Sequence, residues 1–415
     1  MDTPKPYEIP KKVVLDAFQR VKENQGAPGI DGQSIEMFEV DLKNNLYRIW
    51  NRMSSGSYFP PPVKAVEIPK KAGDSRMLGV PTVTDRVAQM VVKMTLEPVV
   101  EPIFHPDSYG YRPGRSAIQA LGVTRRRCWQ YDWVLEFDIK GLFDNIDHDL
   151  LMRAVRWHVD NPWVLLYIER WLKAPFHMPD GTIKEREKGT PQGGVVSPVL
   201  ANLFLHYAFD AWMVRTHPDK PFARYADDAV VHCRTEADAV RLKADLETRL
   251  AECGLELNLD KTRVIYCQDD DRRQSYPNTS FDFLGYTFRP RRSKTGEDRY
   301  FINFSPAVSR KAQKAMRRTV HDWRMHLKSD KTVEDLSRMF NPVIRGWIQY
   351  YGRFYKSELY HVLRYIDRQL ARWAKRKYKK LARGQLRATH WLGKVARRQP
   401  TLFLHWQMGV RPAAG

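Results

Sequence analysis

The sequence predicts an α+β fold in which a sheet of short strands, with helices between them, precedes an all-helical C-terminal region. Two observations indicate this fold class. Short apolar runs alternate with helical segments through the first part of the chain, and from about residue 305 the spacing of apolar residues becomes helical throughout. At 415 residues the chain is also too long for one ordinary domain, so we expect two to four subdomains.

The first elements are predicted to be helices, then strands. Residues 11–55 are mainly helical by pattern, with a turn-rich loop at Gln25–Gly32. Two short strands around a Gly-Asp turn are expected within Tyr58–Thr82. A helix follows over Thr84–Phe104, starting from a capping residue, and Ser108–Leu121 is predicted as a loop that leads into another helix.

The middle of the chain predicts a sheet that contains a hairpin. Trp133–Ile139 is a predicted strand with Asp138 near its C-terminal end, and Ser197–Val214 predicts one long, largely buried helix. The segments FARY and AVVHC are two strand pieces around an Asp pair, which places that pair at a hairpin turn. Thr235–Gly254 is a predicted helix whose first and last residues have capping chemistry, and Phe281–Phe288 is a further strand.

The distribution of charge indicates a polyanionic partner. The formal net charge is +21, and residues 289–415 hold 31 Lys and Arg residues against 8 Asp and Glu residues, so the last third carries the whole excess. A near-neutral body with a basic C-terminal third most simply predicts nucleic-acid binding. Aromatic residues are interleaved with these charges, which favours this interpretation over a merely solvated basic face.

The cysteines and the hydropathy of the chain exclude several classes of protein. The four cysteines show no C-x-x-C spacing, which argues against a zinc ribbon or a metal-bound nuclease module. The first residues lack the apolar core of a signal peptide, and no apolar stretch is long enough to cross a membrane. We therefore expect a cytoplasmic protein with reduced thiols and no membrane partner.

One helix near the C-terminus is predicted to have two different faces. Its apolar residues recur at alternating spacings of four and three residues: Leu359, Leu363, Ile366, Leu370 and Trp373. This spacing predicts a core-facing stripe rather than a binding surface. The cations between these positions then lie on another face: Arg364, Arg368, Arg372 and Lys375. We expect a helical bundle that packs on one side and contacts phosphate groups on the other.

Three carboxylates, on Asp138, Asp227 and Asp228, suggest a metal site. Neighbouring like charges repel, and Asp is a poor strand former. A cation between carboxylates from two strands would offset the repulsion, and Mg²⁺ prefers a few carboxylates, several waters and substrate phosphates. Two such ions suit in-line phosphoryl transfer. An isolated Asp pair is more simply a turn, but the flanking strands and the basic C-terminal third favour the metal site.

An aromatic residue, Phe143, lies five residues after Asp138. Such a side chain could lie beneath the sugar of an incoming nucleotide and leave no room for a 2′-hydroxyl, so that deoxynucleotides are selected by exclusion. The alternative is that Phe143 belongs to the core.

The motifs together resemble the palm of reverse transcriptases that bacterial group II introns encode. The segments, in order, are FDIKGLFDNIDHDLL, GTPQGGVVSPVLANLFLH, RYADDAVV, LELNLDKT and FLGYTF. Upstream, NQGAPGIDG and IPKKAGDSRMLGVPT resemble that family's N-terminal extension and fingers, and PVIRGWIQYYGRF resembles its thumb, the maturase domain. The resemblance covers roughly residues 15–408, and several ordered motifs are far more specific than one.

The resemblance implies a right-hand polymerase, with fingers, an antiparallel palm sheet and helices, followed by an all-helical thumb and a short basic tail. The implied domains are an N-terminal extension (1–55), fingers (56–134), a palm (135–295, with a fingers segment at about 150–195), a thumb or maturase domain (300–380) and a nucleic-acid-binding tail (381–415). Since paired cysteines are lacking, the chain resembles the type without an HNH endonuclease domain. A primer 3′-end must then come from another source.

The resemblance also implies roles for individual residues. Asp138, Asp227 and Asp228 match the catalytic, metal-binding triad, with the Ile139 carbonyl as a further ligand. The implied contacts to the deoxynucleotide triphosphate are Lys70, Arg76, Phe143, Gln192 and Lys261. Lys261 has an alternative role, which is to support the catalytic hairpin electrostatically. Independently, the charge pattern predicts RNA contacts from Arg364, Arg368, Arg372 and Lys375.

The implied function is an RNA-directed DNA polymerase that adds deoxynucleotides to the 3′-hydroxyl of a DNA or RNA primer on an RNA template. It would use two Mg²⁺ ions, with Mn²⁺ as a possible substitute, and would bind a group II intron RNA to assist splicing and mobility in the cytoplasm or on nucleoid DNA. A relative recruited to phage defence or DNA repair, without an intron, is one alternative. An RNA-binding maturase with an inactive polymerase is another, which the intact acidic triad disfavours. The oligomeric state is left open.

Overall fold

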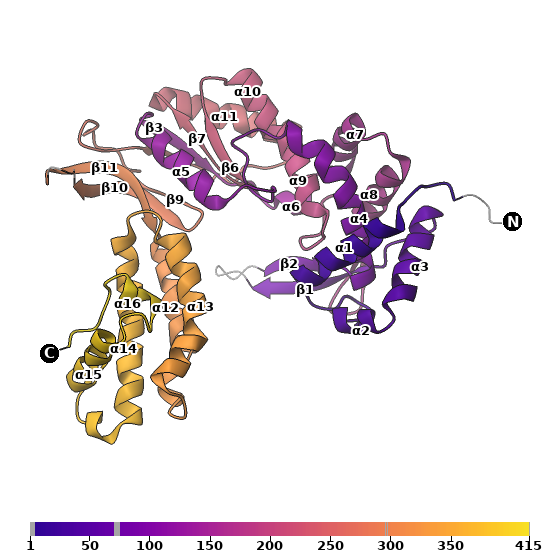
Figure 1. The fold of residues 1–415 in the computed structure, drawn as a ribbon. Helices are drawn as coiled ribbons and strands as arrows, with labels where there is room; N and C mark the ends of the chain where they lie inside the picture. Colours follow the sequence, from indigo (N-terminus) through magenta and orange to yellow (C-terminus); the bar gives the residue numbers. More distant parts are fainter. Residues whose placement is uncertain (1–4, 70–74, 295, 297, 415) are drawn as a thin grey trace. The chain divides into compact units, whose positions relative to one another are not determined.

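The computed structural model describes residues 5–69, 75–294, 296 and 298–414. The chain divides into two compact units (Figure 1). The first comprises residues 1–120, 135–233 and 237–263, and the second comprises residues 121–134, 234–236 and 264–415. The finer division into N-terminal extension, fingers, palm, thumb and tail stays a prediction. Across the described parts of the chain, no helix is both long and apolar enough to cross a membrane.

The first unit begins with helices, as predicted. These are α1 (Lys11–Asn24), α2 (Ile35–Val40) and α3 (Leu42–Ser54). The next helix, α4 (Val83–Val100), is buried along most of its length and contacts α1, α3 and α8 (Pro162–Lys173). The predicted start of α4 at Thr84 is wrong. Its cap is Thr82, which has extended backbone and whose hydroxyl accepts a hydrogen bond from the Asp85 N–H at 3.1 Å.

A small sheet with the strand order β2-β1-β4-β5 lies in the first unit. The predicted strand pair is confirmed, because β1 (Val63–Pro69) and β2 (Ser75–Val80) are antiparallel neighbours. The short β4 (Phe176–His177) adds to β1 in parallel, and β5 (Ile183–Lys184) pairs with β4. A segment more than a hundred residues further along the sequence therefore completes the sheet that the first strand pair begins.

A second sheet has the strand order β6-β7-β3-β8. Its strands are β3 (Trp133–Phe137), β6 (Phe222–Tyr225), β7 (Asp228–Cys233) and β8 (Arg263–Tyr266). The predicted hairpin around the Asp pair is confirmed, since β6 and β7 are antiparallel and their last pair is Tyr225 with Asp228. The helices that accompany this part of the chain are α5 (Ala117–Cys128), α6 (Leu142–Asn145), α7 (His148–His158) and α11 (Glu236–Glu252).

The helix predicted over Ser197–Val214 is interrupted. It consists of α9 (Ser197–Leu205), a π-helical turn at His206–Asp210, and α10 (Ala211–Thr216). The turn changes the backbone hydrogen bonding, and the carbonyls of Tyr207 and Ala208 accept hydrogen bonds from the Arg249 side chain at 3.0 and 3.2 Å. The apolar pattern cannot reveal this turn, because residues on both sides of it remain helical and buried.

The second unit contains a three-stranded antiparallel sheet in the order β11-β10-β9. The single strand predicted at Phe281–Phe288 is a hairpin of β9 (Phe281–Phe283) and the start of β10 (Tyr286–Lys294). Leu284 and Gly285 form the turn with positive φ angles of 49° and 79°, the backbone that favours tight hairpins. The helical region starts at Arg310 rather than near residue 305, because β11 (Tyr300–Val308) pairs with the whole of β10.

Helices form the rest of the second unit: α12 (Arg310–Asp322), α13 (Val333–Tyr351), α14 (Tyr360–Lys377), α15 (Gln385–Arg398) and α16 (Leu404–Gln407). The predicted apolar stripe is confirmed, since Leu359, Leu363, Ile366, Leu370 and Trp373 are all fully buried. Asp367 accepts hydrogen bonds from His405 Nε2 at 2.8 Å and Trp406 Nε1 at 2.9 Å, which fastens α16 to α14.

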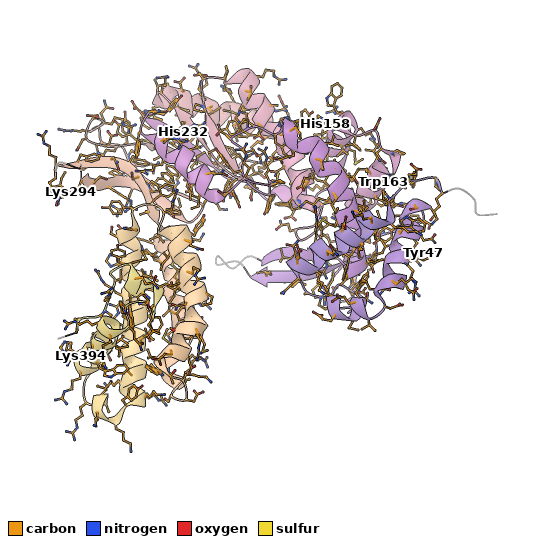
Figure 2. The ribbon with its side chains drawn as sticks, in the orientation of Figure 1. Tyr47, His158, Trp163, His232, Lys294 and Lys394 are labelled. Carbon is orange, nitrogen blue, oxygen red and sulfur yellow. The ribbon has the colours of Figure 1, made fainter. Side chains whose placement is uncertain are left out.

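The side chains of Lys294 and Lys394 extend away from the ribbon of the second unit (Figure 2).

Candidate active site

The hairpin between β6 and β7 places Asp227 in its turn and Asp228 at the start of β7. The turn contains Ala226 with a φ of +57°, a left-handed conformation that is unfavourable for any residue with a Cβ. Its strain is offset by packing and hydrogen bonds. The Ala226 carbonyl accepts a hydrogen bond from Arg224 Nη1 at 3.1 Å, and a Cβ at Gly110 would lie only 2.3 Å from the Ala226 nitrogen.

Arg224 is itself held by a buried ion pair. Its side chain donates to both carboxylate oxygens of Asp210, at 2.7 and 2.6 Å, and to Asn202 Oδ1 at 3.1 Å. Arg224 and Asp210 are 1% and 0% exposed. Such a bidentate pair fixes both partners in one geometry. The hydrogen bonds of Arg224 therefore connect the π-helical turn, which supplies Asp210, with the turn that carries Asp227.

Asp138 follows β3 and is fixed by a second segment of the chain. Its backbone carbonyl accepts from the Asn258 N–H at 2.8 Å, and the following Ile139 forms an antiparallel bridge with Leu257. Its carboxylate Oδ2 accepts from Asn258 Nδ2 at 3.1 Å and from Lys261 Nζ at 2.9 Å. The LELNLDKT segment therefore orients the carboxylate that follows β3.

The Lys261 ammonium responds to all three acids. Its hydrogen bond to Asp138 is the main cause that raises the pKa of Lys261; burial opposes this effect, and the charges of Asp138, Asp228 and Asp227 add to it. Lys261 is therefore a cation at neutral pH, and it contacts the Asp138 carboxylate directly. This finding supports the electrostatic role that the sequence left as an alternative for this residue.

A cavity of about 720 Å³ lies beside the carboxylates of Asp138 and Asp227. Six of the residues predicted from the sequence border it: Asp138, Ile139, Phe143, Gln192, Asp227 and Lys261. Asp228 is exposed and does not line the cavity, although its charge acts on Lys261. Lys70 lies outside the described residues. Arg76 pairs through its backbone with Ile68, and its side chain lies outside what the structure describes.

Phe143 forms part of the wall of the cavity and is 7% exposed. Its backbone carbonyl accepts from the Thr190 N–H at 2.7 Å, and the Gly189 N–H donates to Ile146 O at 2.7 Å. Gly189 has a φ of +81°, and a Cβ there would lie 2.7 Å from the Phe143 carbonyl oxygen. Only glycine therefore allows these two segments to approach so closely and form the wall.

His148 also holds Gly189 in place beside the segment that contains Phe143. Its Nε2 lies 2.7 Å from the Gly189 carbonyl oxygen, so this nitrogen carries the proton and donates. Burial lowers the pKa of His148, against a smaller opposing effect from this hydrogen bond. A neutral imidazole therefore holds the loop.

Gln192 is positioned by the backbone of β2 and by α4. Its carbonyl accepts from the Gly79 N–H at 2.9 Å. Gln89 Oε1 accepts from the Val195 N–H at 2.7 Å, and Gln89 Nε2 donates to Asp85 at 2.9 Å. Asp85 also accepts from Tyr58 and Trp171, and burial raises its pKa. Hydrogen bonds from Asp85 through Gln89 to the Val195 N–H therefore fix the backbone directly after the PQGG segment.

Arg186 is a residue in the cavity that the sequence reasoning missed. Burial lowers its pKa to about 10, and its guanidinium lies over the Phe176 ring at 4.8 Å from the ring centroid. One nitrogen donates to the Ala174 carbonyl, whereas Nε and Nη1 have no hydrogen-bond partner among the residues that the structure describes. A buried guanidinium with unused donors can bind an anion. The segment GTIKEREKG gives no signal that singles out this arginine.

The chemistry of the donors fits a divalent cation. Carboxylate oxygens of Asp138 and Asp227 face the cavity, and the contact that Asp138 makes with Lys261 shows that a positive charge is favourable beside it. Among the described residues, no three His, Cys, Asp or Glu side chains gather closely enough to hold an ion by themselves. This arrangement is compatible with Mg²⁺, which binds through one or two carboxylates together with substrate phosphates and water.

Comparison with known proteins gives the family. Residues 68–288, more than half of the chain, match the family model described as reverse transcriptase (RNA-dependent DNA polymerase). The chain belongs to this reverse transcriptase family. Residues 313–391 match the group II intron, maturase-specific domain, so the second unit carries a domain of that kind. Reverse transcriptases generally use divalent metal ions, and the two matched domains together indicate that the chain binds RNA.

Individual proteins are similar to this chain in sequence, and one of them is encoded by a group II intron. Protein YkfC of Escherichia coli (strain K12) is 32% identical over 330 residues, which cover 69% of this chain and 82% of YkfC. The group II intron-encoded protein LtrA of Lactococcus lactis is 36% identical over 203 residues, 48% of this chain and 33% of LtrA. The match therefore spans about a third of LtrA. A solved telomerase of Candida albicans aligns with a TM-score of 0.46 at 12% identity, over 90% of this chain and 67% of that one.

Proposed function

We propose that the cavity beside Asp138 and Asp227 is where this reverse transcriptase adds deoxynucleotides to a primer 3′-hydroxyl on an RNA template. The observation that supports the proposal is that residues from distant parts of the sequence line one cavity. Acids that follow two different strands share one cavity with Phe143, Gln192 and a cationic lysine. A cavity of about 720 Å³ is within the usual size for a site that binds a small ligand such as a nucleotide.

Asp138, Asp227 and Asp228, with the Ile139 carbonyl, are the proposed ligands of two Mg²⁺ ions. When bound, such ions make the attacking 3′-oxygen more acidic and stabilise the leaving pyrophosphate. The protein supplies the geometry. Asn258 and Lys261 orient the Asp138 carboxylate, and the Arg224–Asp210 pair fixes the turn that carries Asp227.

The remaining residues of the cavity bind and select the nucleotide in this proposal. Phe143 excludes the 2′-hydroxyl, and Gln192 lies beside the base and sugar. The proposed phosphate contacts are Arg186, which lines the cavity, and the two cations that the family resemblance implies, Lys70 and Arg76. Lys261 reduces the repulsion between the three carboxylates before the ions and the substrate bind.

For the second unit, we propose contacts with template, primer and group II intron RNA. Arg364, Arg368 and Arg372 are exposed, and Lys375 is half-buried on the same helix. An earlier helix of the second unit, α12, adds cations that the sequence reasoning did not single out, since Arg310, Lys314 and Arg318 are exposed on it at four-residue spacing. The match to a maturase-specific domain supports intron RNA as one partner.

The test is primer extension on an RNA template in the presence of Mg²⁺, with the substitution Asp227→Asn. This change keeps the size of the side chain but removes a charged ligand, and we expect a loss of at least about 10³-fold in rate. Asp219→Asn is the matched control, because Asp219 is an exposed aspartate that forms an ion pair with the adjacent Lys220 and does not line the cavity. The control should extend primers at the wild-type rate, and both variants should still bind RNA. Extension by Asp227→Asn within tenfold of wild type would show that the metal assignment is wrong.

A further inference from the structure

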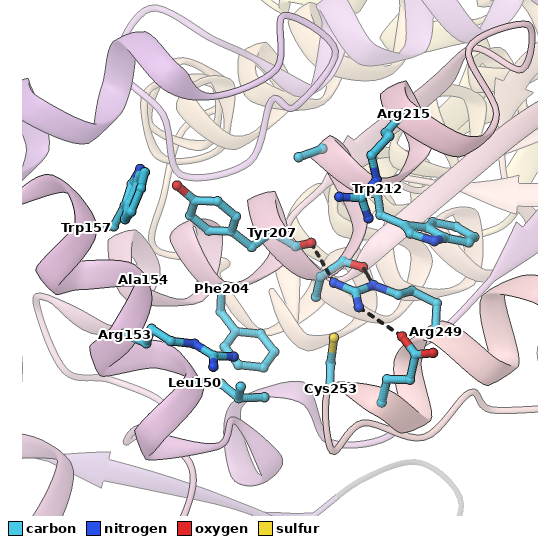
Figure 3. Close-up of a pocket in the computed structure, with 13 residues that line it drawn as sticks. Leu150, Arg153, Ala154, Trp157, Phe204, Tyr207, Trp212, Arg215, Arg249 and Cys253 are labelled. Carbon is cyan, nitrogen blue, oxygen red and sulfur yellow. Dashed lines mark hydrogen bonds and ion pairs between the residues drawn. The ribbon is translucent and has the colours of Figure 1, made fainter.

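A second cavity, of about 490 Å³, lies in the first unit and shares no lining residue with the candidate active site (Figure 3). One face of α7 forms one side, through Leu150, Arg153, Ala154 and Trp157, which follow helical spacing. The α9–α10 segment forms a second side, and the end of α11 a third. Among the residues that they contribute are Phe204, Tyr207, Trp212, Arg215, Arg249 and Cys253.

The lining has the composition of a binding surface rather than of a packing defect. Trp, Tyr and Arg are the residues most enriched where proteins bind tightly, and the cavity combines two Trp, one Tyr and three Arg residues with small apolar ones. Trp157 is 80% exposed, which is unusual for so large an apolar side chain. Its ring is therefore available to pack against another molecule.

The charges of the cavity are mainly positive. Arg153 and Arg215 are exposed, and neither has an acidic partner within ion-pair distance among the described residues. Arg249 is the third arginine and pairs with Glu252, the only acid in the lining, at 3.0 Å. Two cations on the rim are thus left without a counter-charge, so an acidic ligand is favoured.

The π-helical turn shapes this cavity. Tyr207 and Ala208 belong to the turn, and Arg249 donates to both of their carbonyls (Figure 3). The guanidinium thus holds an irregular backbone that carries the Tyr207 ring along the wall. Turns of this kind are frequent at functional sites. Asp210, the last residue of this turn, pairs with Arg224 near the candidate active site, whereas Tyr207 and Ala208 line the second cavity, which contains no residue of the proposed polymerase chemistry.

We propose that this cavity docks a segment of a partner protein, an acidic peptide that inserts a bulky apolar side chain between Trp157, Tyr207 and Trp212. The apolar floor accepts the anchor, and Arg153 and Arg215 pair with carboxylates on either side of it. A nucleobase fits this site less well. Its polar edges would meet mainly the apolar side chains of Leu150, Ala154 and Phe204, and the Arg249 guanidinium is already engaged.

The experiment selects peptides rather than assuming one. The full chain is immobilised with excess transfer RNA, which occupies its nucleic-acid-binding surfaces, and is panned with a phage library of random dodecapeptides. Selected peptides are then synthesised with a fluorophore, and their binding is measured by anisotropy. The variants are Trp157→Ala and the pair Arg153→Glu with Arg215→Glu. The matched control is Arg241→Glu, an exposed arginine of α11 that does not line the cavity.

We expect enrichment of peptides in which Asp or Glu flanks Trp, Phe or Leu. Both pocket variants should bind these peptides at least about tenfold more weakly, and the control within about twofold of wild type. Because all the substituted side chains are exposed, each variant should fold and extend primers as the wild type does.

Four outcomes would overturn the proposal. The first is selection without an acidic and apolar bias, and the second is equal binding by wild type and pocket variants. The third is a loss of single-stranded RNA binding in Trp157→Ala as large as the loss of peptide binding, which would assign the site to RNA. The fourth is sedimentation that shows a dimer which Trp157→Ala dissociates, in which case the occupant is a second copy of this chain.

Discussion

An arginine of the first unit and two arginines of the second unit differ in their burial and in their partners. In the first unit, Arg224 lies in β6, the strand before the turn that carries Asp227; it is 1% exposed and makes a bidentate pair with Asp210. In the second unit, Arg368 and Arg372 of α14 are exposed, while the buried side of the helix is mainly apolar. The comparison teaches that burial decides what a charge can do. A buried, paired arginine fixes structure, whereas an exposed arginine is available to a ligand and contributes little to folding.

The largest expected effect on stability comes from breaking the buried pair. Arg224→Ala leaves the Asp210 carboxylate buried without its partner, and such a change costs about 3–5 kcal/mol of unfolding free energy. The measurement is urea unfolding of the full chain. Arg372→Ala is the matched control, since it removes the same type of side chain from an exposed site, and its midpoint should stay at the wild-type value.

A double substitution sharpens this comparison. Replacing both partners, with Arg224→Met and Asp210→Leu, removes the unpaired charge, so most of the lost stability should return. Primer extension should remain impaired, because the Ala226 carbonyl still lacks the donor that holds the turn. If the double variant regains stability and activity together, the pair does not position the hairpin.

The next effect concerns selectivity at the wall of the active-site cavity. Phe143→Ala opens space beneath the sugar, and we expect the ratio of ribonucleotide to deoxynucleotide incorporation to rise by about tenfold. Phe209→Leu is the control, since Phe209 is a buried aromatic that packs on Phe137 and does not line the cavity. An unchanged ratio in Phe143→Ala would leave Phe143 as a core residue.

The sequence could predict features that neighbouring residues determine, but not features that depend on contacts between distant parts of the chain. Asp138 follows an apolar run, and Asp227 lies between two strand pieces, so their convergence in one cavity was accessible from pattern and motif. The Arg224–Asp210 pair was not, because it joins a strand to an unpredicted π-helical turn. Arg186 was missed for a related reason, since its burial arises from the packing of a loop and not from its neighbours in sequence.

The β10–β11 pair shows the same limit in the fold. The sequence of β10, YTFRPRRSK, contains a proline and four cations, which are poor strand residues, so only its first residues were predicted as a strand. The strand nevertheless forms because β11 pairs with all of it. Pro290 is tolerated since it lies beyond Phe288, the last residue of β10 that pairs with β9.

A pH effect distinguishes the first unit further. Burial lowers the pKa of His148, His158, His206 and His217, all of which belong to that unit. As the pH falls through the unfolded value of about 6.5, the unfolded chain binds protons that the folded chain does not. The unfolding free energy should therefore decrease as the pH falls from about 7.5 to 5.5.

The measurement compares urea unfolding of wild type and His148→Gln at these two values of pH. Glutamine can still donate to the Gly189 carbonyl but does not titrate, so the decrease should be smaller in the variant. The comparison also removes the contribution of Asp85, whose raised pKa acts in the opposite direction and is common to both proteins. An equal decrease in the two proteins would show that His148 is not a source of the pH dependence.

The smallest effect per residue is expected on α14, where the charges face solvent. Each phosphate contact releases counterions, so removing one should reduce the slope of log affinity against log salt by about 0.7 to 0.9. Changing Arg368 and Arg372 together to Gln should weaken binding of RNA with little regard to its sequence and should lower the slope by about twice that amount. Thermal stability should barely change, because neither side chain is buried.

The test is filter binding of one RNA over a salt series, with the double variant against wild type. A matched control changes two exposed cations elsewhere, Arg241 and Lys43 of the first unit, to Gln, which alters the net charge equally. If the double variant and wild type give parallel slopes, α14 does not contact RNA. If the control lowers the slope as much as the double variant does, the effect comes from net charge. A decrease confined to the α14 variant would place the RNA phosphates on the helix face that its apolar stripe leaves exposed.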